Sequence, residues 1–212
     1  MAEIQDTPTE LVSLISPDTM IKVSSTLDKS VGKKNLIDGS SETCWTSQQG
    51  LPQTITLTFP NSSSSTSRGV VPKSLSLTFQ GGFVGRTCAV YVRPVLDAAL
   101  AKEKPDWTLL TYVYPEDVNR RQTFTLPAVS SSSPPPATAS HAPTSSTASS
   151  SSSPNDADSS IKLENNKDLK QNQAGVGTSA LRLTFETSSD FFGRITVYDL
   201  ELKGYRLGGE AS

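Results

Sequence analysis

The chain has 212 residues, of which 34% are hydrophobic and 19% are charged, and its formal net charge at pH 7 is −2. The near-neutral charge and the lack of a long Lys or Arg run argue against a protein that binds nucleic acid directly. The hydrophobic fraction is low for a chain that folds throughout, so we expect one compact domain joined to polar segments.

The first residues indicate a polar leader rather than a targeting or membrane segment. Residues 1–20 contain neither the basic and apolar regions of a signal peptide nor an apolar run long enough to span a bilayer. We therefore expect residues 1–16 to be a flexible leader. We also expect no membrane contact and an intracellular protein, resident in the nucleus, the cytoplasm or both.

The stretch Asn35–Phe59 combines a turn, a tryptophan and a strand. Asp38 and Gly39 have turn chemistry, because an Asp side chain accepts bonds from nearby backbone amides and Gly tolerates a positive φ. The large apolar area of Trp45 predicts a core anchor for this loop, with an exposed ligand platform as the alternative. After it, apolar residues alternate with threonines up to Phe59, the period of a strand with one buried face.

The same alternation predicts strands along the rest of the chain. The expected strands are residues 20–23, 54–59, 74–79, 88–92, 107–114, 124–126, 180–185 and 195–202. In the last of these the apolar residues change phase after Val197, which predicts a bulge or burial on both faces. One helical turn is expected at residues 32–37 and a short helix at 95–102, and residues 61–69 form a serine-rich loop.

Residues 130–178 are expected to be a disordered insertion. From Ser130 to Ser160 the chain is almost entirely Ser, Pro, Ala, Thr, Asn and Asp, which cannot bury enough apolar surface to offset the entropy of folding. Residues 17–129 and 179–207 would then form one discontinuous domain, followed by a flexible tail at 208–212. About eight short strands without a long helix predict an all-β fold, an antiparallel jelly-roll β-sandwich.

Catalytic and metal-binding chemistry find little support in the sequence. The only histidine, His141, lies in the expected insertion, where nothing would hold its geometry for catalysis or zinc binding. Cys44 and Cys88 are expected to be small core residues, with a disulfide as the alternative. Glu116 and Asp117 are adjacent acids in a proline-containing turn, which more often cap the turn in solvent than transfer protons. We expect no enzyme activity.

Loop residues that mix aromatic and charged side chains are better candidates for binding a protein partner. Aromatic rings supply contact area and arginine supplies fixed hydrogen-bond donors, so the mixture suits interface anchors. The candidates are Phe83, Arg86, Tyr114, Glu116, Asp117, Phe191, Phe192 and Arg194. Two alternatives stay open, since Phe192 could plug the end of the sandwich and Arg194 could simply pair with Asp190.

Four segments resemble those of a known family. They are GKKNLIDGSSETCWTSQQG (residues 32–50), TFQGGF (78–83), YPEDVNRRQTF (114–124) and DFFGRITVY (190–198). In the first segment an Asp-Gly turn precedes Thr43 and Trp45, which resembles the galactose-binding-like, or discoidin, superfamily. In combination the four segments resemble the nuclear receptor subfamily 2 group C member 2 associated protein family, within that superfamily.

This resemblance implies a galactose-binding-like sandwich and a non-enzymatic role, in which the protein represses an orphan nuclear receptor by interfering with its DNA binding. We accordingly expect a monomeric adaptor or co-repressor-type regulator of a transcription factor or nuclear receptor-like partner. A carbohydrate-binding module is the alternative. The superfamily often holds a structural calcium ion, and Asp38, Thr43 and Asp199 occupy matching positions, although two carboxylates fall short of the six or more oxygens that calcium prefers. No other cofactor is expected.

Overall fold

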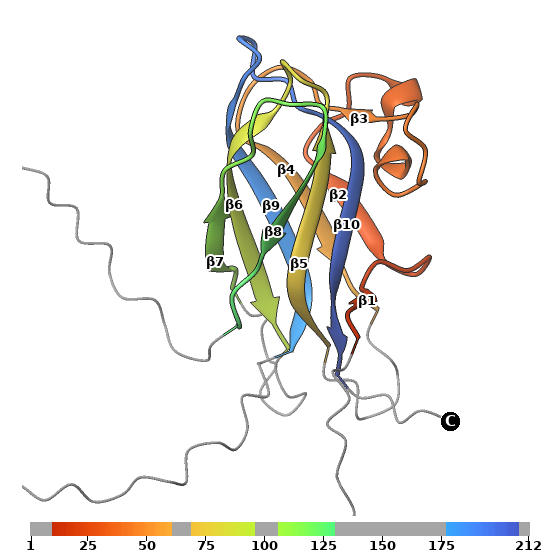
Figure 1. The fold of residues 1–212 in the computed structure, drawn as a ribbon, viewed down its shortest axis with the longest axis vertical. Helices are drawn as coiled ribbons and strands as arrows, with labels where there is room; N and C mark the ends of the chain where they lie inside the picture. The colour runs from red at the N-terminus through yellow and green to blue at the C-terminus, as the bar shows by residue number, and fades with distance from the viewer. Residues whose placement is uncertain (1–9, 61–68, 96–105, 130–176, 208–212) are drawn as a thin grey trace, which may run out of the picture. The chain divides into compact units, whose positions relative to one another are not determined.

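The structure, a computed structural model, describes residues 10–60, 69–95, 106–129 and 177–207. These residues form two layers of antiparallel strands packed face to face (Figure 1). The first layer consists, in spatial order, of β2 (Met20–Val23), β4 (Gln53–Thr58), β9 (Thr178–Ser188), β6 (Gly85–Pro94) and β7 (Thr108–Val113). The second consists of β8 (Arg121–Thr125), β5 (Val70–Phe79) and β10 (Thr196–Arg206), with β1 (Val12–Ser13) and β3 (Trp45–Thr46) both paired to β10. This arrangement confirms the predicted jelly-roll β-sandwich.

The alternation of apolar and polar residues accounts for both layers. In β4, Ile55 and Leu57 are fully buried, whereas the threonines between them point outward. The corresponding apolar residues of β5 and β9 are buried in the same way, and the rings of Phe79 and Phe185 meet edge to face with centroids 5.9 Å apart. Each such side chain contributes about 1.5–3 kcal/mol by leaving water, so the period-2 pattern fixes which face of each strand turns inward.

The eight strands expected from the sequence are present, with shifted ends. The strand expected at 74–79 begins at Val70, the one expected at 88–92 runs from Gly85 to Pro94, and the last extends to Arg206. The predicted bulge is confirmed, because the pairing of β10 with β5 shifts register between Val197 and Asp199. The expected helical turn is also present as a 3₁₀ helix, η2 (Lys33–Leu36), preceded by a second one, η1 (Lys29–Val31).

Two expected boundaries are wrong. Residues 1–16 were expected to be a leader, yet β1 pairs with β10, Leu14 is fully buried and its backbone amide donates to the Leu202 carbonyl at 2.8 Å. The expected insertion also extends too far, because β9 begins at Thr178. Residues 1–9, 61–68, 96–105, 130–176 and 208–212 lie outside the described residues, and with them His141 and nearly all of the short helix expected at 95–102.

The connections divide between the two ends of the sandwich (Figure 1). At one end lie the residues that border the undescribed segments: the Val95 amide donates to the Gly177 carbonyl, and the Leu207 amide donates to the Gly69 carbonyl. The opposite end carries residues 47–52, 80–84, 114–120 and 189–195, and we call it the loop end. The antiparallel topology thus brings together four loops that are far apart in the sequence.

The two cysteines are free thiols, so the disulfide alternative is wrong. Cys88 is fully buried in the core, and this burial raises the pKa of its thiol. Cys44 is half-buried beside Thr46. A raised pKa keeps a thiol protonated and unreactive, which suits Cys88 as a packing residue.

Candidate partner-binding site

Trp45 is a core anchor and not an exposed platform. Its side chain is fully buried, and its indole Nε1–H donates to the Ser25 carbonyl at 3.0 Å. The turn before it also matches the prediction, since Gly39 has a φ of +72° and Asp38 Oδ1 accepts from the Ser40 amide at 2.9 Å. This segment therefore holds the loops against the sandwich rather than meeting a ligand.

The three calcium candidates, Asp38, Thr43 and Asp199, already have partners within the protein. Thr43 donates its hydroxyl proton to Asp38 Oδ2 at 2.6 Å, and this bond lowers the pKa of Asp38. Asp199 lies 3.3 Å from an Arg121 guanidinium nitrogen, and its partial burial raises its pKa. A carboxylate paired with a guanidinium and an aspartate occupied by local donors fit a cation poorly. A structural calcium ion stays a prediction that these contacts do not favour.

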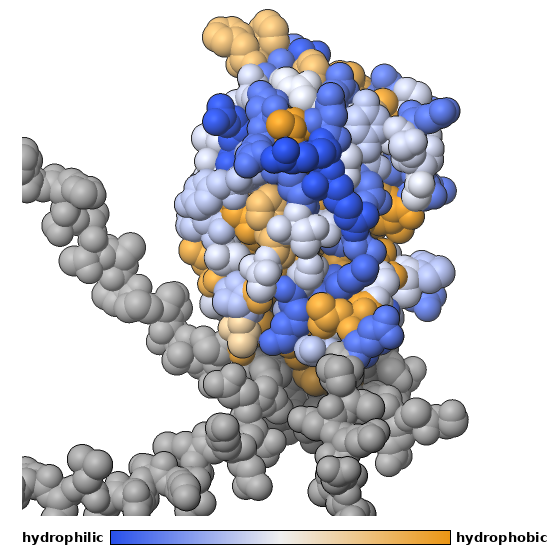
Figure 2. Space-filling view, in the orientation of Figure 1, coloured by the Kyte–Doolittle hydropathy of each residue, from blue (hydrophilic) through white to orange (hydrophobic). Residues whose placement is uncertain are grey.

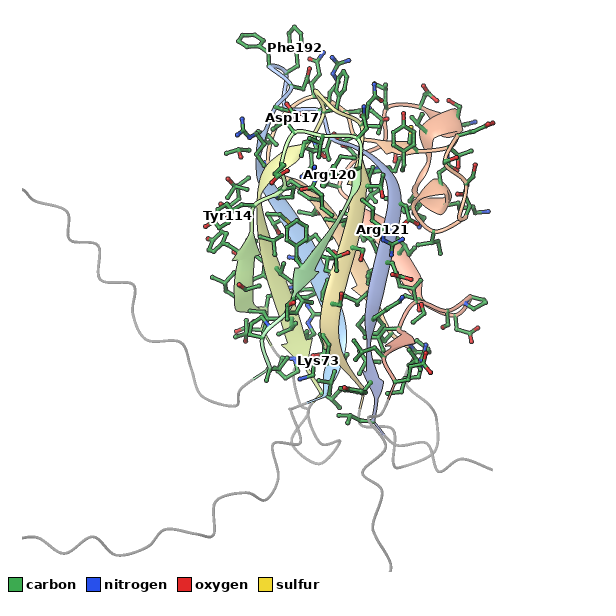
Figure 3. All side chains as sticks on the ribbon, viewed as in Figure 1. Lys73, Tyr114, Asp117, Arg120, Arg121 and Phe192 are labelled. Atoms are coloured by element: carbon green, nitrogen blue, oxygen red, sulfur yellow. The ribbon has the colours of Figure 1, made fainter. Side chains whose placement is uncertain are left out.

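The eight candidate residues lie at the loop end or at the strand ends that border it. Figure 3 labels Phe192 at its tip, with Asp117 and Tyr114 on the neighbouring loop. Asp117 Oδ1 accepts from the Gly82 amide at 2.7 Å, and Asn119 Oδ1 accepts from the Gly81 amide at 2.5 Å. These bonds tie the 114–120 loop to the 80–84 loop.

Glu116 and Asp117 are exposed turn residues with separate partners. Glu116 forms an ion pair with Arg120, and its backbone amide donates to Gln122 Oε1 at 2.8 Å. Asp117 is engaged by the Gly82 amide. Each acid therefore has its own structural partner, in agreement with the solvated-cap interpretation.

The tip of the loop end is an exposed pair of phenylalanines. Phe191 is 94% exposed and Phe192 is 53% exposed, and their rings meet edge to face with centroids 5.3 Å apart. Phe192 therefore does not plug the sandwich. The Gly50 amide donates to the Phe192 carbonyl at 2.8 Å, which places the half-exposed Leu51 beside this loop. In Figure 2 apolar residues protrude at this end above a hydrophilic band.

Arg194 supports this tip from below. Asp190 Oδ2 accepts from Arg194 Nε at 3.1 Å and from its backbone amide at 3.0 Å, while Asp190 Oδ1 accepts from Nη2 at 3.1 Å. The guanidinium carbon also lies 4.9 Å from the centre of the Phe83 ring and 5.8 Å from that of Phe192. The alternative that Arg194 pairs with Asp190 is thus confirmed, and the pair orients a cation between two aromatic rings.

The hydrogen bond from Arg194 lowers the pKa of Asp190 below its ordinary 3.8. The ion pair therefore stabilises the folded state fully above pH 3.8. This stabilisation is lost as the pH falls through the lowered pKa of the folded state. We expect Asp190→Asn to lower the melting temperature at neutral pH, and the difference from wild type to vanish in acid. Thermal melts from about pH 7 to pH 2 measure this. Glu186→Gln is the control, and a deficit that stays constant into acid contradicts the assignment.

A hollow of about 560 Å³ lies where the ends of β6 and β9 meet the 114–120 loop. It is lined by Arg86, Thr87, Tyr114, Pro115, Glu116, Thr187 and Ser188. Tyr114 is 66% exposed and stacks on Tyr112, with ring centroids 6.3 Å apart. The candidates therefore form two neighbouring groups, an apolar tip around Phe191 and a polar hollow around Arg86.

Sequence reasoning missed Leu51 and Asn119. Leu51 stands alone between Gly50 and Pro52, so no periodic pattern marks it as a surface apolar residue. Asn119 lies in the predicted turn, but its bond to the Gly81 amide joins residues 38 positions apart and leaves no local signal. The Gly50–Phe192 bond beside Leu51 and the Gly81–Asn119 bond both join loops that only the pairing of the strands brings together.

Within the described residues, no helix combines the length and the apolar character that crossing a bilayer requires. In the same residues, no three His, Cys, Asp or Glu side chains gather into a metal-binding group.

Comparison with solved structures identifies the fold. A family 32 carbohydrate-binding module of Clostridium perfringens, in complex with galactose, matches 92% of this chain and 99% of its own with a TM-score of 0.52 and 12% identity. A second Clostridium perfringens protein, in complex with GalNAc-β-1,3-galactose, matches 90% of this chain and 99% of its own with a TM-score of 0.53 and 10% identity. At such identities the likeness shows a galactose-binding-like fold and carries no function.

Sequence comparison identifies the family. No family model matches the chain. The nuclear receptor 2C2-associated protein of Mus musculus is 30% identical over 200 residues, which are 92% of this chain and 98% of the relative. That of Xenopus tropicalis is 31% identical over 197 residues, which are 92% and 99% of the two chains. The chain therefore belongs to the nuclear receptor 2C2-associated protein family.

Proposed function

We propose that this chain is a non-enzymatic adaptor that binds a nuclear receptor or similar transcription factor through its loop end and regulates it. It acts inside the cell, in the nucleus or cytoplasm, as a monomer and without direct contact to nucleic acid or membrane. The names of its relatives describe association with a nuclear receptor. A protein partner therefore accounts for the exposed loop end more simply than a small-molecule substrate does.

The observation that carries this proposal is the exposure of Phe191 and Phe192 side by side. Adjacent exposed aromatic rings on a monomer mark an interaction site more often than a solvent surface. The ion pair of Arg194 with Asp190 holds the surrounding loop in place before binding. Little conformational entropy is then lost when a partner covers the tip.

A carbohydrate-binding role is the second candidate, favoured by the exposed Tyr114 beside the polar hollow. Carbohydrate-binding modules use aromatic faces next to hydrogen-bonding groups, but fold likeness alone does not supply such a site. A glycan array decides this point. Binding of a glycan that is lost in Tyr114→Ala would establish the second role.

The main test is affinity capture of a tagged chain from its native cells. We expect Phe191→Ala/Phe192→Ala to reduce capture of a receptor or transcription factor by about tenfold or more, because the truncation removes central aromatic anchors. The matched control is Met20→Ala, whose side chain is 68% exposed on β2, away from the loop end. Equal capture by both variants would refute the proposal, and unchanged melting temperatures show that both remain folded.

A further inference from the structure

The outward face of the β2–β4–β9–β6–β7 layer carries a group of cations that the loop end does not use. Strand pairing aligns Lys22, Thr56, Arg182, Tyr91 and Leu109 in one row across the five strands. Arg93 lies two residues beyond Tyr91 on β6 and points to the same face. Because side chains alternate along a strand, the buried residues of these strands occupy the opposite face.

Arg93 and Arg182 converge on one aromatic ring. Their guanidinium carbons lie 4.3 Å and 4.2 Å from the centre of the Trp107 ring, which belongs to the residue just before β7. Stacking on an indole holds a guanidinium in a fixed plane and leaves its terminal nitrogens available. The ring therefore orients two guanidinium groups that come from different strands.

These two charges are uncompensated within the described part of the chain. Arg120, Arg121 and Arg194 each pair with a carboxylate, whereas neither Arg93 nor Arg182 forms an ion pair with a described residue. Arg182 Nε donates to Thr56 Oγ1 at 3.3 Å. Arg93 Nε is buried and has no acceptor among the residues that the structure describes. Two cations that share one ring and have no counter-charge among the described residues attract an anion at their terminal nitrogens.

We propose that Arg93 and Arg182 form a binding site for a phosphate monoester carried on a peptide, that is, for phosphoserine or phosphothreonine of a partner protein. Guanidinium groups bind phosphate oxygens through paired, charge-assisted hydrogen bonds, and two of them match a group with nearly two negative charges. Trp107 acts as a positioning residue.

Two observations favour a peptide over a nucleic acid. Both guanidinium groups already lie against the Trp107 ring, so a nucleic acid base would have to displace them in order to stack on it. The chain also has a net charge of −2, without the broad positive surface that a phosphate backbone needs. Tyr91 and Leu109 lie in the same row as Arg182 and offer a peptide further contacts. An isolated phosphate ion cannot make those contacts, so it binds more weakly.

Trp107 provides the readout. Trp45 is fully buried and bonded to Ser25, so a change in tryptophan emission on anion binding comes from Trp107. The full chain is titrated with acetyl-Ala-phosphoserine-Ala-amide, with the same peptide lacking phosphate, and with inorganic phosphate. We expect the phosphopeptide to bind about tenfold or more tightly than either of the others, and added salt to weaken it.

Variants assign the effect to the two arginines. Arg93→Gln/Arg182→Gln should abolish the preference for the phosphorylated peptide, whereas Arg86→Gln at the loop end, and Phe191→Ala/Phe192→Ala, should keep it. Equal affinity for both peptides, or an equal loss in Arg86→Gln, overturns the proposal. If inorganic phosphate binds as tightly as the phosphopeptide, the site does not recognise a peptide. If an oligonucleotide binds more tightly than the phosphopeptide and needs the same two arginines, the ligand is a nucleic acid and the proposal is wrong.

Discussion

Replacing Trp45 with alanine should lower the free energy of unfolding by about 3–5 kcal/mol, among the largest effects of any single substitution in this chain. The side chain is fully buried, and its indole joins the loop before β4 to the Ser25 loop. Truncation removes this area from the core and leaves a cavity that the surrounding strands can fill only in part. Denaturant unfolding followed by circular dichroism measures the loss.

Two further variants separate the contributions of Trp45. Trp45→Phe keeps most of the apolar area but leaves the Ser25 carbonyl without its donor, so we expect a smaller loss of about 1–3 kcal/mol. Phe191→Ala truncates an aromatic residue that is 94% exposed and should leave stability unchanged. Similar losses for Trp45→Ala and Phe191→Ala would show that Trp45 is not a core anchor.

Gly204→Ala should be the second strongly destabilising change, because β10 and β5 approach too closely there for a side chain. A Cβ at this position would lie 2.1 Å from the Val71 carbonyl oxygen and 2.9 Å from Leu14 Cδ1. The nearest atom belongs to the backbone, so the clash cannot be relieved by rotating a side chain. Overpacking of this kind costs about 1–3 kcal/mol and occasionally more, and thermal melts of the variant measure it.

Gly32→Ala is the matched control for Gly204→Ala. Its Cβ would meet only the Lys29 carbonyl oxygen at 3.5 Å, an ordinary contact, and its φ of −79° suits any residue. We expect its melting temperature to stay at the wild-type value. If Gly204→Ala is equally harmless, β1 and β5 do not pack against β10 in the way the structure shows.

The strands were predictable wherever burial of one face imposes a period of two. Ile55, Leu57 and their threonine neighbours show this in β4, and even the bulge in β10 was visible as a change of phase after Val197. The two-residue strands β1 and β3 carry no such period. Their positions depend on pairing with β10, a strand more than 140 residues away in the sequence, so local patterns cannot reveal them.

The sequence indicates which types of residue belong to the candidate site, but it does not indicate how they are arranged in space. The structure places the mixtures of aromatic and charged residues around Phe83, Tyr114 and Phe192 in loops, and their role in binding stays a prediction. That these loops meet at one end follows only from the strand order, and the placement of Arg194 between Phe83 and Phe192 needs tertiary contacts. The group around Trp107 could not be predicted from the sequence either, because its two arginines lie on β6 and β9 and meet only in the folded sheet.

The proposed function requires the loop end to be the surface that meets a protein partner. Its most direct test places a photo-reactive benzoylphenylalanine at position 191 in one chain and at position 20 in another, since both side chains are exposed but lie on different parts of the sandwich. After irradiation in native cells, we predict a discrete adduct with a nuclear receptor or transcription factor from position 191 and none from position 20. An adduct with that partner from position 20 alone, or equally from both positions, would contradict the account.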